Sequence, residues 1–291
     1  MIISFEPCPL CENTSYQQLF VTDKYPIISC LKCGLCRTKH DLHSNDFMKM
    51  YGSNYFKMSD PKRVGYANYY AMENTLRQNF RKRCRAVKKT IPKGFTKLFE
   101  IGTGPGFFLD ECRKIGFDVE GIELSQDAVT FARETLNLNV TNSKIEDVKA
   151  KDKFDVICSW DTIEHVSDPN NFLNTVTNLL DENGYLFLST GDRDSLVARI
   201  SRSKWHLYTP PAHLFFFSKK TLSLLLKKHG FTVISVKYPI YSYTIAYLLE
   251  KGLAPINKTF GIPTPSVELL ENHSLPFTLF DVMDITAVRT S

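Results

Sequence analysis

The chain has 291 residues, of which 43% are hydrophobic and 23% are charged, and its formal net charge is +5. This length and apolar content are enough for the core of one large domain, or of one domain with a small attachment. The mild charge does not require a nucleic-acid partner, and no run of about 20 apolar residues predicts a membrane span. The opening "MIISFEPCPL" lacks the features of a signal peptide. We therefore expect a cytoplasmic protein whose cysteines are thiols or metal ligands.

Five cysteines lie within the first 36 residues, as "CPLC", "CLKC" and then Cys36. Two C-x-x-C pairs at this separation are typical of a four-thiolate zinc ribbon, and such a site leaves no open position for chemistry. We expect residues 1–40 to form this ribbon. Cys36 makes an iron–sulfur cluster the alternative. The expected ligands of the structural zinc are Cys8, Cys11, Cys30 and Cys33.

Residues 41–95 combine a polar, tyrosine-rich connector with a basic segment. Nine basic residues and no acid occur between Arg77 and Lys97, which makes nucleic-acid binding one interpretation. The apolar residues of this segment recur at helical spacing, so we favour an amphipathic helix with a solvated basic face. These apolar residues are Leu76, Phe80, Cys84, Val87 and Ile91.

Residues 96–291 alternate between short apolar strands and amphipathic helices. This alternation predicts an α/β fold with a doubly wound, mostly parallel sheet. Strands are expected at 97–101, 117–122, 154–160, 185–190, 231–238 and 277–290, and helices at 106–116, 125–138, 169–184 and 218–230. Residues 239–276 break the rhythm and are expected to form an insertion or lid before the last strand.

The run "FEIGTGPG" places three glycines between the first strand and the first helix of this sheet. Such a turn lies at the carboxyl edge of the sheet, where backbone amides and a helix N-terminus meet a ligand. Glu123 follows at the end of the second strand, where a carboxylate accepts hydrogen bonds from ribose hydroxyls. The dinucleotide pattern G-x-G-x-x-G/A is not matched, because Phe107 occupies its third small position. The pattern predicts a nucleoside ligand and disfavours NAD and FAD.

The runs "EIGTGPG", "GIELS" and "FDVICSWDTIEHVSDP" resemble the successive motifs of class I S-adenosylmethionine-dependent methyltransferases. "WHLYTPPAHLFFFSKKTLSLLLKKHGF" resembles a later segment of ubiquinone-type O-methyltransferases and of sugar methyltransferases. Several of those sugar enzymes also carry a zinc-binding N-terminus followed by a tyrosine-rich segment similar to "YGSNYF". The resemblance implies a seven-stranded Rossmann-like methyltransferase sheet and S-adenosylmethionine as the cofactor.

By position, this resemblance assigns the glycine turn and Glu100 to the methionine part of the cofactor. Glu123 would bind the ribose and Leu124 would cover the adenine. Trp160 and Asp161 would face the methionine and the entering substrate, with ordinary core as the alternative for Trp160. The implied cofactor-binding residues are Glu100, Gly102, Thr103, Gly104, Gly106, Glu123, Leu124, Ser125, Lys144, Ile145, Trp160 and Asp161.

Methyl transfer to a hydroxyl requires a group that removes its proton. The candidate bases are His165, His206, Tyr208 and His213. "WDTIEHV" also resembles the divalent-metal site of certain O-methyltransferases, with Asp161, Glu164 and His165 as ligands and His213 as a partner. A hard cation such as magnesium would lower the pKa of the acceptor hydroxyl. The alternative is that Glu164 and His165 only shape the turn into the next helix.

The expected function is methylation of a small molecule, with a hydroxyl of a sugar, nucleotide sugar, glycan precursor or natural product as the first choice. One alternative is an RNA methyltransferase that uses the ribbon and the basic helix. Another is a scaffold that binds the cofactor without turnover. The sequence does not specify the acceptor atom or the oligomeric state.

Overall fold

The structure is a computed structural model that describes residues 1–40, 69–148, 153–245 and 274–290. Its central sheet consists of β5 (Lys97–Ile101), β6 (Asp118–Glu123), β7 (Asn139–Asn142), β8 (Phe154–Trp160), β9 (Leu180–Gly191), β11 (Phe231–Lys237) and β14 (Val282–Arg289). The order is β11-β14-β9-β8-β5-β6-β7. The five strands from β9 to β7 are parallel, and β14 lies antiparallel between β9 and β11. The predicted seven-stranded, mostly parallel sheet is confirmed.

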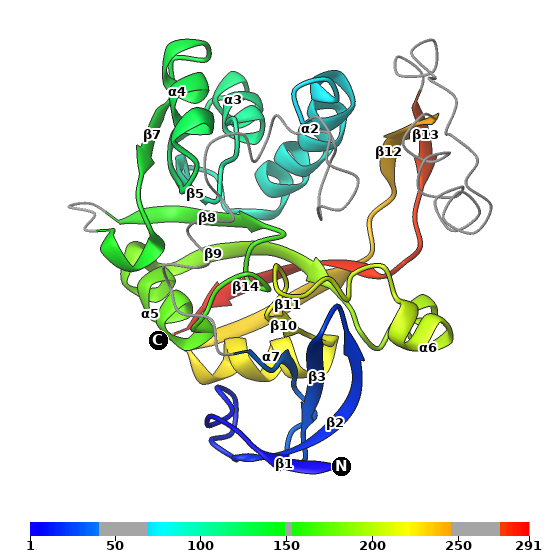
Figure 1. Ribbon diagram of the computed structural model, residues 1–291. Helices are drawn as coiled ribbons and strands as arrows, with labels where there is room; N and C mark the ends of the chain where they lie inside the picture. Colours follow the sequence, from blue (N-terminus) through cyan, green and yellow to red (C-terminus); the bar gives the residue numbers. More distant parts are fainter. Residues whose placement is uncertain (41–68, 149–152, 246–273, 291) are drawn as a thin grey trace.

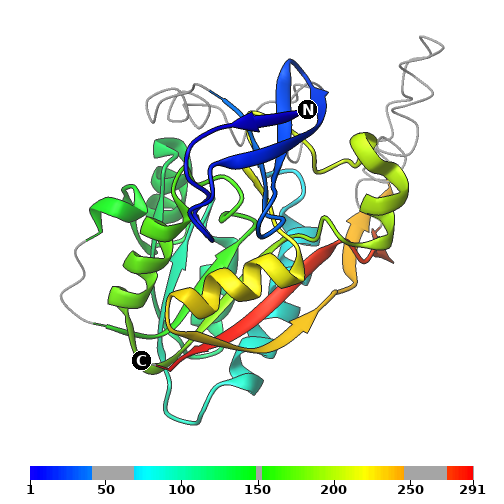
Figure 2. The same ribbon diagram turned by 90° about the horizontal axis from the view of Figure 1, so that it is seen from below.

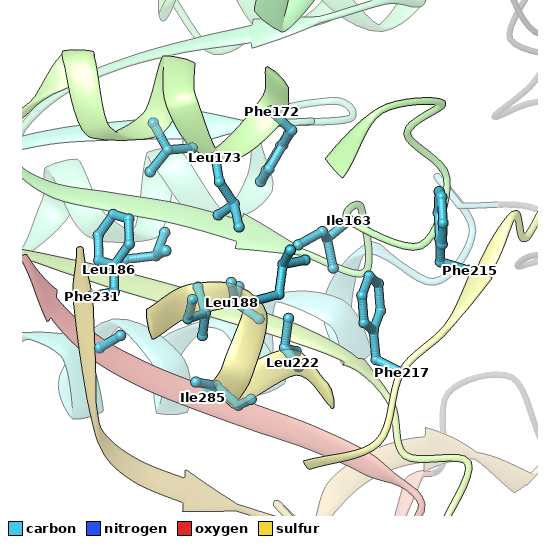
Figure 3. Packing of buried hydrophobic residues seen from close by; sticks show 14 of the residues in the cluster. Ile163, Phe172, Leu173, Leu186, Leu188, Phe215, Phe217, Leu222, Phe231 and Ile285 are labelled. Atoms are coloured by element: carbon cyan, nitrogen blue, oxygen red, sulfur yellow. The ribbon is translucent and has the colours of Figure 1, made fainter. Parts of the chain in front are cut away.

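Helices cover both faces of this sheet (Figure 1). They are α2 (Glu73–Thr90), α3 (Phe107–Lys114), α4 (Gln126–Glu134), α5 (Pro169–Leu179), α6 (Leu196–Ser201) and α7 (Lys219–Lys228), with 3₁₀ turns η1 (Ile145–Asp147) and η2 (Arg202–Lys204). The first three helices pack on one face and α5 and α7 on the other. Figure 3 shows the second of these layers, where side chains of α5 and α7 meet those of β9 and β14.

Helices α4, α5 and α7 begin where the sequence supplies side-chain oxygens for the unpaired amides of the first turn. The Ser125 hydroxyl accepts a hydrogen bond from the third residue of α4. Asp168 accepts from two amides at the start of α5, which has Pro169 in its first turn. Ser218 and Thr221 form a capping box at α7. These local signals explain why the predicted helix starts agree with the structure.

The helix predicted at 169–184 is shorter than expected. It ends at Leu179, and the next residue already belongs to β9. Leu180 pairs with Phe154 of β8, and the ladder then has an irregularity before it resumes. Asn183 has a φ of 61°, a conformation that asparagine tolerates better than most residues. Strand pairing with β8 therefore overrides the helical pattern of these five positions.

Gly121 in β6 lies against the glycine turn, and we expect Gly121→Ala to destabilise the protein. A Cβ there would lie 2.4 Å from Thr103 Cγ2 and 2.9 Å from the Glu100 backbone oxygen. The backbone contact cannot be relieved by a rotamer change, so the expected loss is about 1–3 kcal/mol of unfolding free energy. Urea titration measures this loss. Glu120→Ala, an exposed change in the same strand, is the control, and equal stability of the two variants would contradict the expectation.

The N-terminal cysteine-rich segment forms a second sheet that includes a short strand from the second half of the sequence, β10. Its order is β1-β2-β3-β4-β10. β10 pairs antiparallel with β4, and Figure 2 shows these N-terminal strands on the same side of the central sheet as α7. The division of the chain into domains at 1–40, 41–95 and 96–291 stays a prediction. The N-terminal sheet is not confined to the first of these ranges, because β10 belongs to the third. The strands are β1 (Ile2–Ser4), β2 (Ser15–Thr22), β3 (Tyr25–Cys30), β4 (Cys36–Thr38) and β10 (Phe215–Phe216).

A two-stranded antiparallel sheet of β12 (Tyr241–Thr244) and β13 (Ser274–Phe277) lies beside α2. The amide group of Asn79 bonds both the backbone N–H and the carbonyl of Ser242, at 2.7 and 2.8 Å. Most of the predicted insertion at 239–276 and the tyrosine-rich connector up to residue 68 lie outside the described residues. Within the described residues, no helix is long and apolar enough to cross a membrane.

Candidate active site

The glycine turn joins β5 to α3 at the carboxyl edge of the central sheet. Gly102, Gly104 and Gly106 have φ angles of 77°, 52° and 89°, which glycine adopts without steric cost. The N–H groups of Gly102 and Thr103 donate to the Ile122 carbonyl at 2.9 and 3.1 Å. The turn is thereby held against the end of β6, with bare backbone on its outer side.

Glu123 connects this turn to the next one. Its Oε2 accepts from the Gly104 N–H and its Oε1 from the Ser125 N–H, each at 2.8 Å. Burial raises the pKa of Glu123, although these backbone donors oppose the shift. Each carboxylate oxygen retains a further lone pair. The side chain can therefore order the turn and still accept hydrogen bonds from ribose hydroxyls.

The residues predicted to contact adenine lie in the turn after β6 and at η1. Asn142 of β7 donates to the carbonyls of Glu123 and Leu124 at 3.0 and 2.8 Å, which fixes this turn. Ile145 is buried and begins η1 directly after Lys144. The structure thus brings these predicted residues to one place, and Asn142 is an addition that sequence reasoning missed.

In the region predicted to bind the methionine part of the cofactor, three buried polar atoms lie without a hydrogen-bond partner among the described residues. They are Glu100 Oε2, Trp160 Nε1 and Arg83 Nε. Burial raises the pKa of Glu100 well above its usual range, with Cys84 and Glu123 adding to the effect and Arg83 opposing it. Buried polar groups are almost always hydrogen-bonded, so these atoms are expected to bind a ligand. The Glu100 carboxyl group suits a cationic group and the Arg83 guanidinium an anionic group, and an amino acid carries both.

Arg83 is a buried charged residue that sequence reasoning missed. Its guanidinium carbon lies 4.1 Å from the Trp160 ring centroid and 4.8 Å from that of Tyr241. It also forms an ion pair with Asp284 at 3.0 Å. The basic helix was expected to present a solvated face, which is wrong for Arg83, a buried residue of α2. The available signal was its position seven residues after Leu76, on the apolar stripe.

Asp161 directly follows β8 and has a left-handed conformation, with a φ of 48°. Its N–H donates to the Ser189 carbonyl at 3.1 Å. Its Oδ1 accepts from the Ser189 hydroxyl at 2.7 Å. These contacts with β9 orient Asp161 at the carboxyl edge, next to Trp160. The carboxylate does not belong to the group of potential metal ligands that follows it in the sequence.

Glu164, His165 and His213 form that group, with ligand atoms within 4.8 Å of one another. His165 Nδ1 bonds the Ala212 carbonyl at 2.9 Å, and His213 Nδ1 bonds the Leu207 carbonyl at 2.8 Å. A carbonyl only accepts, so Nδ1 carries the proton and the lone pair lies on Nε2.

The electrostatics of this group favour neutral side chains. Burial lowers the pKa of both histidines, and His165 lowers that of His213 further. Burial together with Asp161 raises the pKa of Glu164 to about 8. Glu164 Oε2 has no hydrogen-bond partner among the described residues. Two neutral imidazoles and one unpartnered carboxyl oxygen fit a divalent cation.

The remaining candidate bases lie elsewhere on the same loop. Tyr208 is buried, with its ring 4.9 Å from that of Phe20 and 4.7 Å from that of Phe216. His206 is half-exposed and its Nε2 bonds Asp281 at 2.7 Å. Burial raises the pKa of Tyr208, which works against a role as a base. Tyr208 therefore contributes mainly to packing against the N-terminal sheet.

The four predicted zinc ligands form one cluster. The Sγ atoms of Cys8 and Cys33 are 3.5 Å apart, as are those of Cys11 and Cys30. Tetrahedral zinc with bonds of about 2.3 Å requires sulfur separations of about 3.8 Å, so the cluster fits this ion closely. Cys36 does not belong to the cluster and packs in a separate apolar core.

Comparison with known proteins identifies the family of the chain. A family model described as a methyltransferase domain matches residues 71–236, more than half of the chain. The ubiquinone biosynthesis O-methyltransferase of Pelagibacter ubique is 28% identical over 176 residues, which cover 50% of this chain and 73% of that enzyme. The enzyme of the same name from Glaesserella parasuis is 32% identical over 108 residues, which cover 33% of this chain and 46% of that enzyme.

Solved structures show the same fold. Magnesium protoporphyrin IX methyltransferase from Synechocystis with bound SAH has a TM-score of 0.54 at 14% identity, and the match covers 85% of this chain and 100% of that one. An S-adenosylmethionine-dependent methyltransferase from Archaeoglobus fulgidus has a TM-score of 0.50 at 20% identity, over 76% of this chain and 100% of that one.

A glycine turn after β5, an acid at the end of β6 and an antiparallel β14 in a parallel sheet together define the class I S-adenosylmethionine-dependent methyltransferases. The chain belongs to the methyltransferase-domain family and is an enzyme of this class.

Proposed function

We propose that this enzyme methylates a hydroxyl group of a small molecule. The observation that carries the proposal is the cluster in which Glu164 and His165, shortly after β8, meet His213, which lies just before β10. The relatives whose names specify O-methylation support a hydroxyl acceptor. A sugar or glycan-precursor hydroxyl remains the first choice from the resemblance of the N-terminal segment, and a phenolic hydroxyl is the competing choice.

The residues around the cofactor position have distinct roles in this proposal. Glu123 binds the ribose, Glu100 the methionine ammonium group and Arg83 the methionine carboxylate. Trp160 and Asp161 border the methyl group. S-adenosylmethionine supplies an already activated methyl group, so the protein has to align the acceptor and remove its proton. If no cation is bound at this cluster, His165 or His213 accepts that proton through Nε2.

A divalent cation would be held by Glu164, His165 and His213, where it would supply charge that lowers the pKa of the acceptor hydroxyl. Magnesium was the expected ion, but the donor set has two nitrogens and one oxygen, and Asp161 is engaged with Ser189. Imidazole ligands favour a transition ion such as manganese or zinc over magnesium.

The RNA alternative receives little support from the basic helix. Arg77 of α2 forms ion pairs with Glu73, Asp110 and Glu111 at 2.7–2.8 Å. Arg83 faces the active site. Two of the basic residues that suggested phosphate contacts are therefore engaged within the protein.

The test is a methyl-transfer screen with isotopically labelled S-adenosylmethionine against nucleotide sugars, free sugars and catechols. We expect a product with one labelled methyl group on oxygen, located by fragmentation. Transfer to nitrogen or carbon only, or no transfer to any hydroxyl compound, would refute the proposal.

Glu164→Gln tests the role of the cation. With the acceptor found by the screen, we expect the rate to fall by at least about tenfold, because the carboxylate ligand is lost. Added manganese should stimulate the chelated native enzyme but not the variant. Asp168→Asn, which changes the cap of α5 outside the cluster, is the control. Full activity of chelated enzyme that retains its cysteine-bound zinc would exclude cation assistance.

A further inference from the structure

We propose that the N-terminal sheet supports the His213 side of the active site, and that Thr38 is the positioning residue that links the two. The proposal rests on the proposed function only for what His213 does in the reaction. The link itself follows from strand pairing, hydrogen bonds and the position of the cysteine cluster.

Thr38 is the last residue of β4 and is fully buried. Its N–H donates to the Leu214 carbonyl and its hydroxyl to the His213 carbonyl, each at 2.8 Å. These two bonds fix consecutive peptide groups, one of them belonging to His213 itself. The His213 ring is then oriented by Leu207 and lies 4.7 Å from the His165 ring. Thr38 therefore controls where the His213 backbone lies, without touching the imidazole.

The pairing of β4 with β10 extends this contact. Arg37 pairs with Phe215 and Cys36 with Phe216. On the other side, the N–H groups of Leu214 and Phe215 donate to the Glu164 carbonyl at 2.8 and 3.2 Å. The strand after His213 is thus held between β4 and the loop that carries Glu164 and His165. A displacement of β4 would change the separation of the cluster's ligand atoms.

The cysteine cluster lies immediately before β4 in the chain. Only residues 34–37 separate Cys33 from Thr38, and Gly34 donates to the Cys30 carbonyl at 2.9 Å. Both cysteine turns also form hydrogen bonds with residues of the methyltransferase domain. The Gly34 carbonyl accepts from Arg193 at 3.2 Å. The Pro9 carbonyl accepts from Asn170 of α5 and Lys228 of α7 at 3.0 and 2.8 Å. Metal bound by the four cysteines would therefore hold the start of β4 in place against the methyltransferase domain.

The cofactor site has no comparable dependence. The glycine turn, Glu123 and Arg83 belong to β5, β6 and α2, and the contacts described above hold them without residues of the N-terminal sheet. Disturbing β4 should change His213 and leave cofactor binding intact. This separation distinguishes a positioning role from a general loss of structure.

Thr38→Val tests the link, because it removes the hydroxyl bond to His213 and keeps the side-chain shape. Protein labelled with ¹⁵N-histidine is compared by NMR, with the His213 signal assigned from its absence in His213→Gln. We expect the His213 imidazole signal to shift in Thr38→Val, and to keep its position in Thr38→Ser, which retains the hydroxyl. Thr22→Val, at the far end of β2, is the control. The affinity for S-adenosylhomocysteine should be unchanged in all three variants.

A second measurement uses native protein that holds no divalent cation at the Glu164, His165 and His213 cluster, before and after chelation removes the metal from the four cysteines. We expect chelation to move the same His213 signal while S-adenosylhomocysteine still binds. An unchanged His213 signal in both Thr38→Val and chelated protein would overturn the proposal. A shifted signal in a protein that methylates no hydroxyl compound would support the link and refute only the proposed function.

Discussion

Replacing Glu123 with alanine is expected to lower the affinity for S-adenosylhomocysteine by at least about tenfold. The reason is the loss of two hydrogen bonds between the carboxylate and the ribose hydroxyls, each of which contributes roughly 1.5–3 kcal/mol. The structure adds a second effect. The N–H groups of Gly104 and Ser125 lose their acceptor, so the glycine turn loses its connection to the turn after β6. We therefore also expect a stability loss of about 1–3 kcal/mol.

Calorimetry measures the affinity and urea titration the stability. Glu120→Ala removes an exposed acid from the same strand and should change neither quantity. Glu123→Gln keeps an acceptor for one amide and should lose less stability than alanine while still binding the ligand weakly. Undiminished affinity of Glu123→Ala would remove Glu123 from the cofactor site.

Replacing Cys30 with serine is expected to abolish high-affinity zinc binding by the N-terminal sheet. Structural zinc sites contribute on the order of 10 kcal/mol of binding free energy to folding, so the cysteine turns should lose order without the metal, while residues such as Tyr16, Ile28 and Leu35 still pack in the core that contains α5 and α7. The central sheet should remain folded, because the layer between α2–α4 and the sheet contains no residue of this segment. Elemental analysis gives the metal content, and hydrogen exchange shows which strands lose protection.

Cys36→Ala is the matched control, since Cys36 lies in the same segment but outside the cluster. It should keep one zinc per chain. Native protein with no zinc, or with the absorption of an iron–sulfur cluster, would contradict the zinc assignment. Loss of protection in β5 and β6 of Cys30→Ser would show that the central sheet depends on the metal.

Features encoded by neighbouring residues could be predicted from the sequence. The glycine turn, Glu123 and the helix caps depend on residues a few positions apart or on adjacent strands, so their spacing is visible in the chain. The pair of C-x-x-C turns is similar, because each turn is local and zinc geometry relates the two. The apolar runs of β5, β6 and β8 likewise report strands that are buried on both faces.

Features that depend on distant contacts could not be predicted. The pairing of β4 with β10 joins residues about 180 positions apart and involves only two residues of β10. The two-stranded sheet of β12 and β13 is held in place by Asn79. Asn79 is an ordinary polar residue of α2, a helix whose sequence suggests exposure to solvent. Arg83 was misinterpreted because a basic run normally faces solvent, and only its contacts with Trp160 and Asp284 show why this residue does not.

A crystal structure of the protein with S-adenosylhomocysteine tests the central claim most directly. We predict ribose hydroxyls on Glu123, the homocysteine ammonium group near Glu100 and its carboxylate near Arg83, with adenine between Leu124 and Ile145. Electron density for the nucleoside at the glycine turn would confirm the cofactor site. Binding at another place, or no binding in crystals that accept NAD at this turn, would contradict the account.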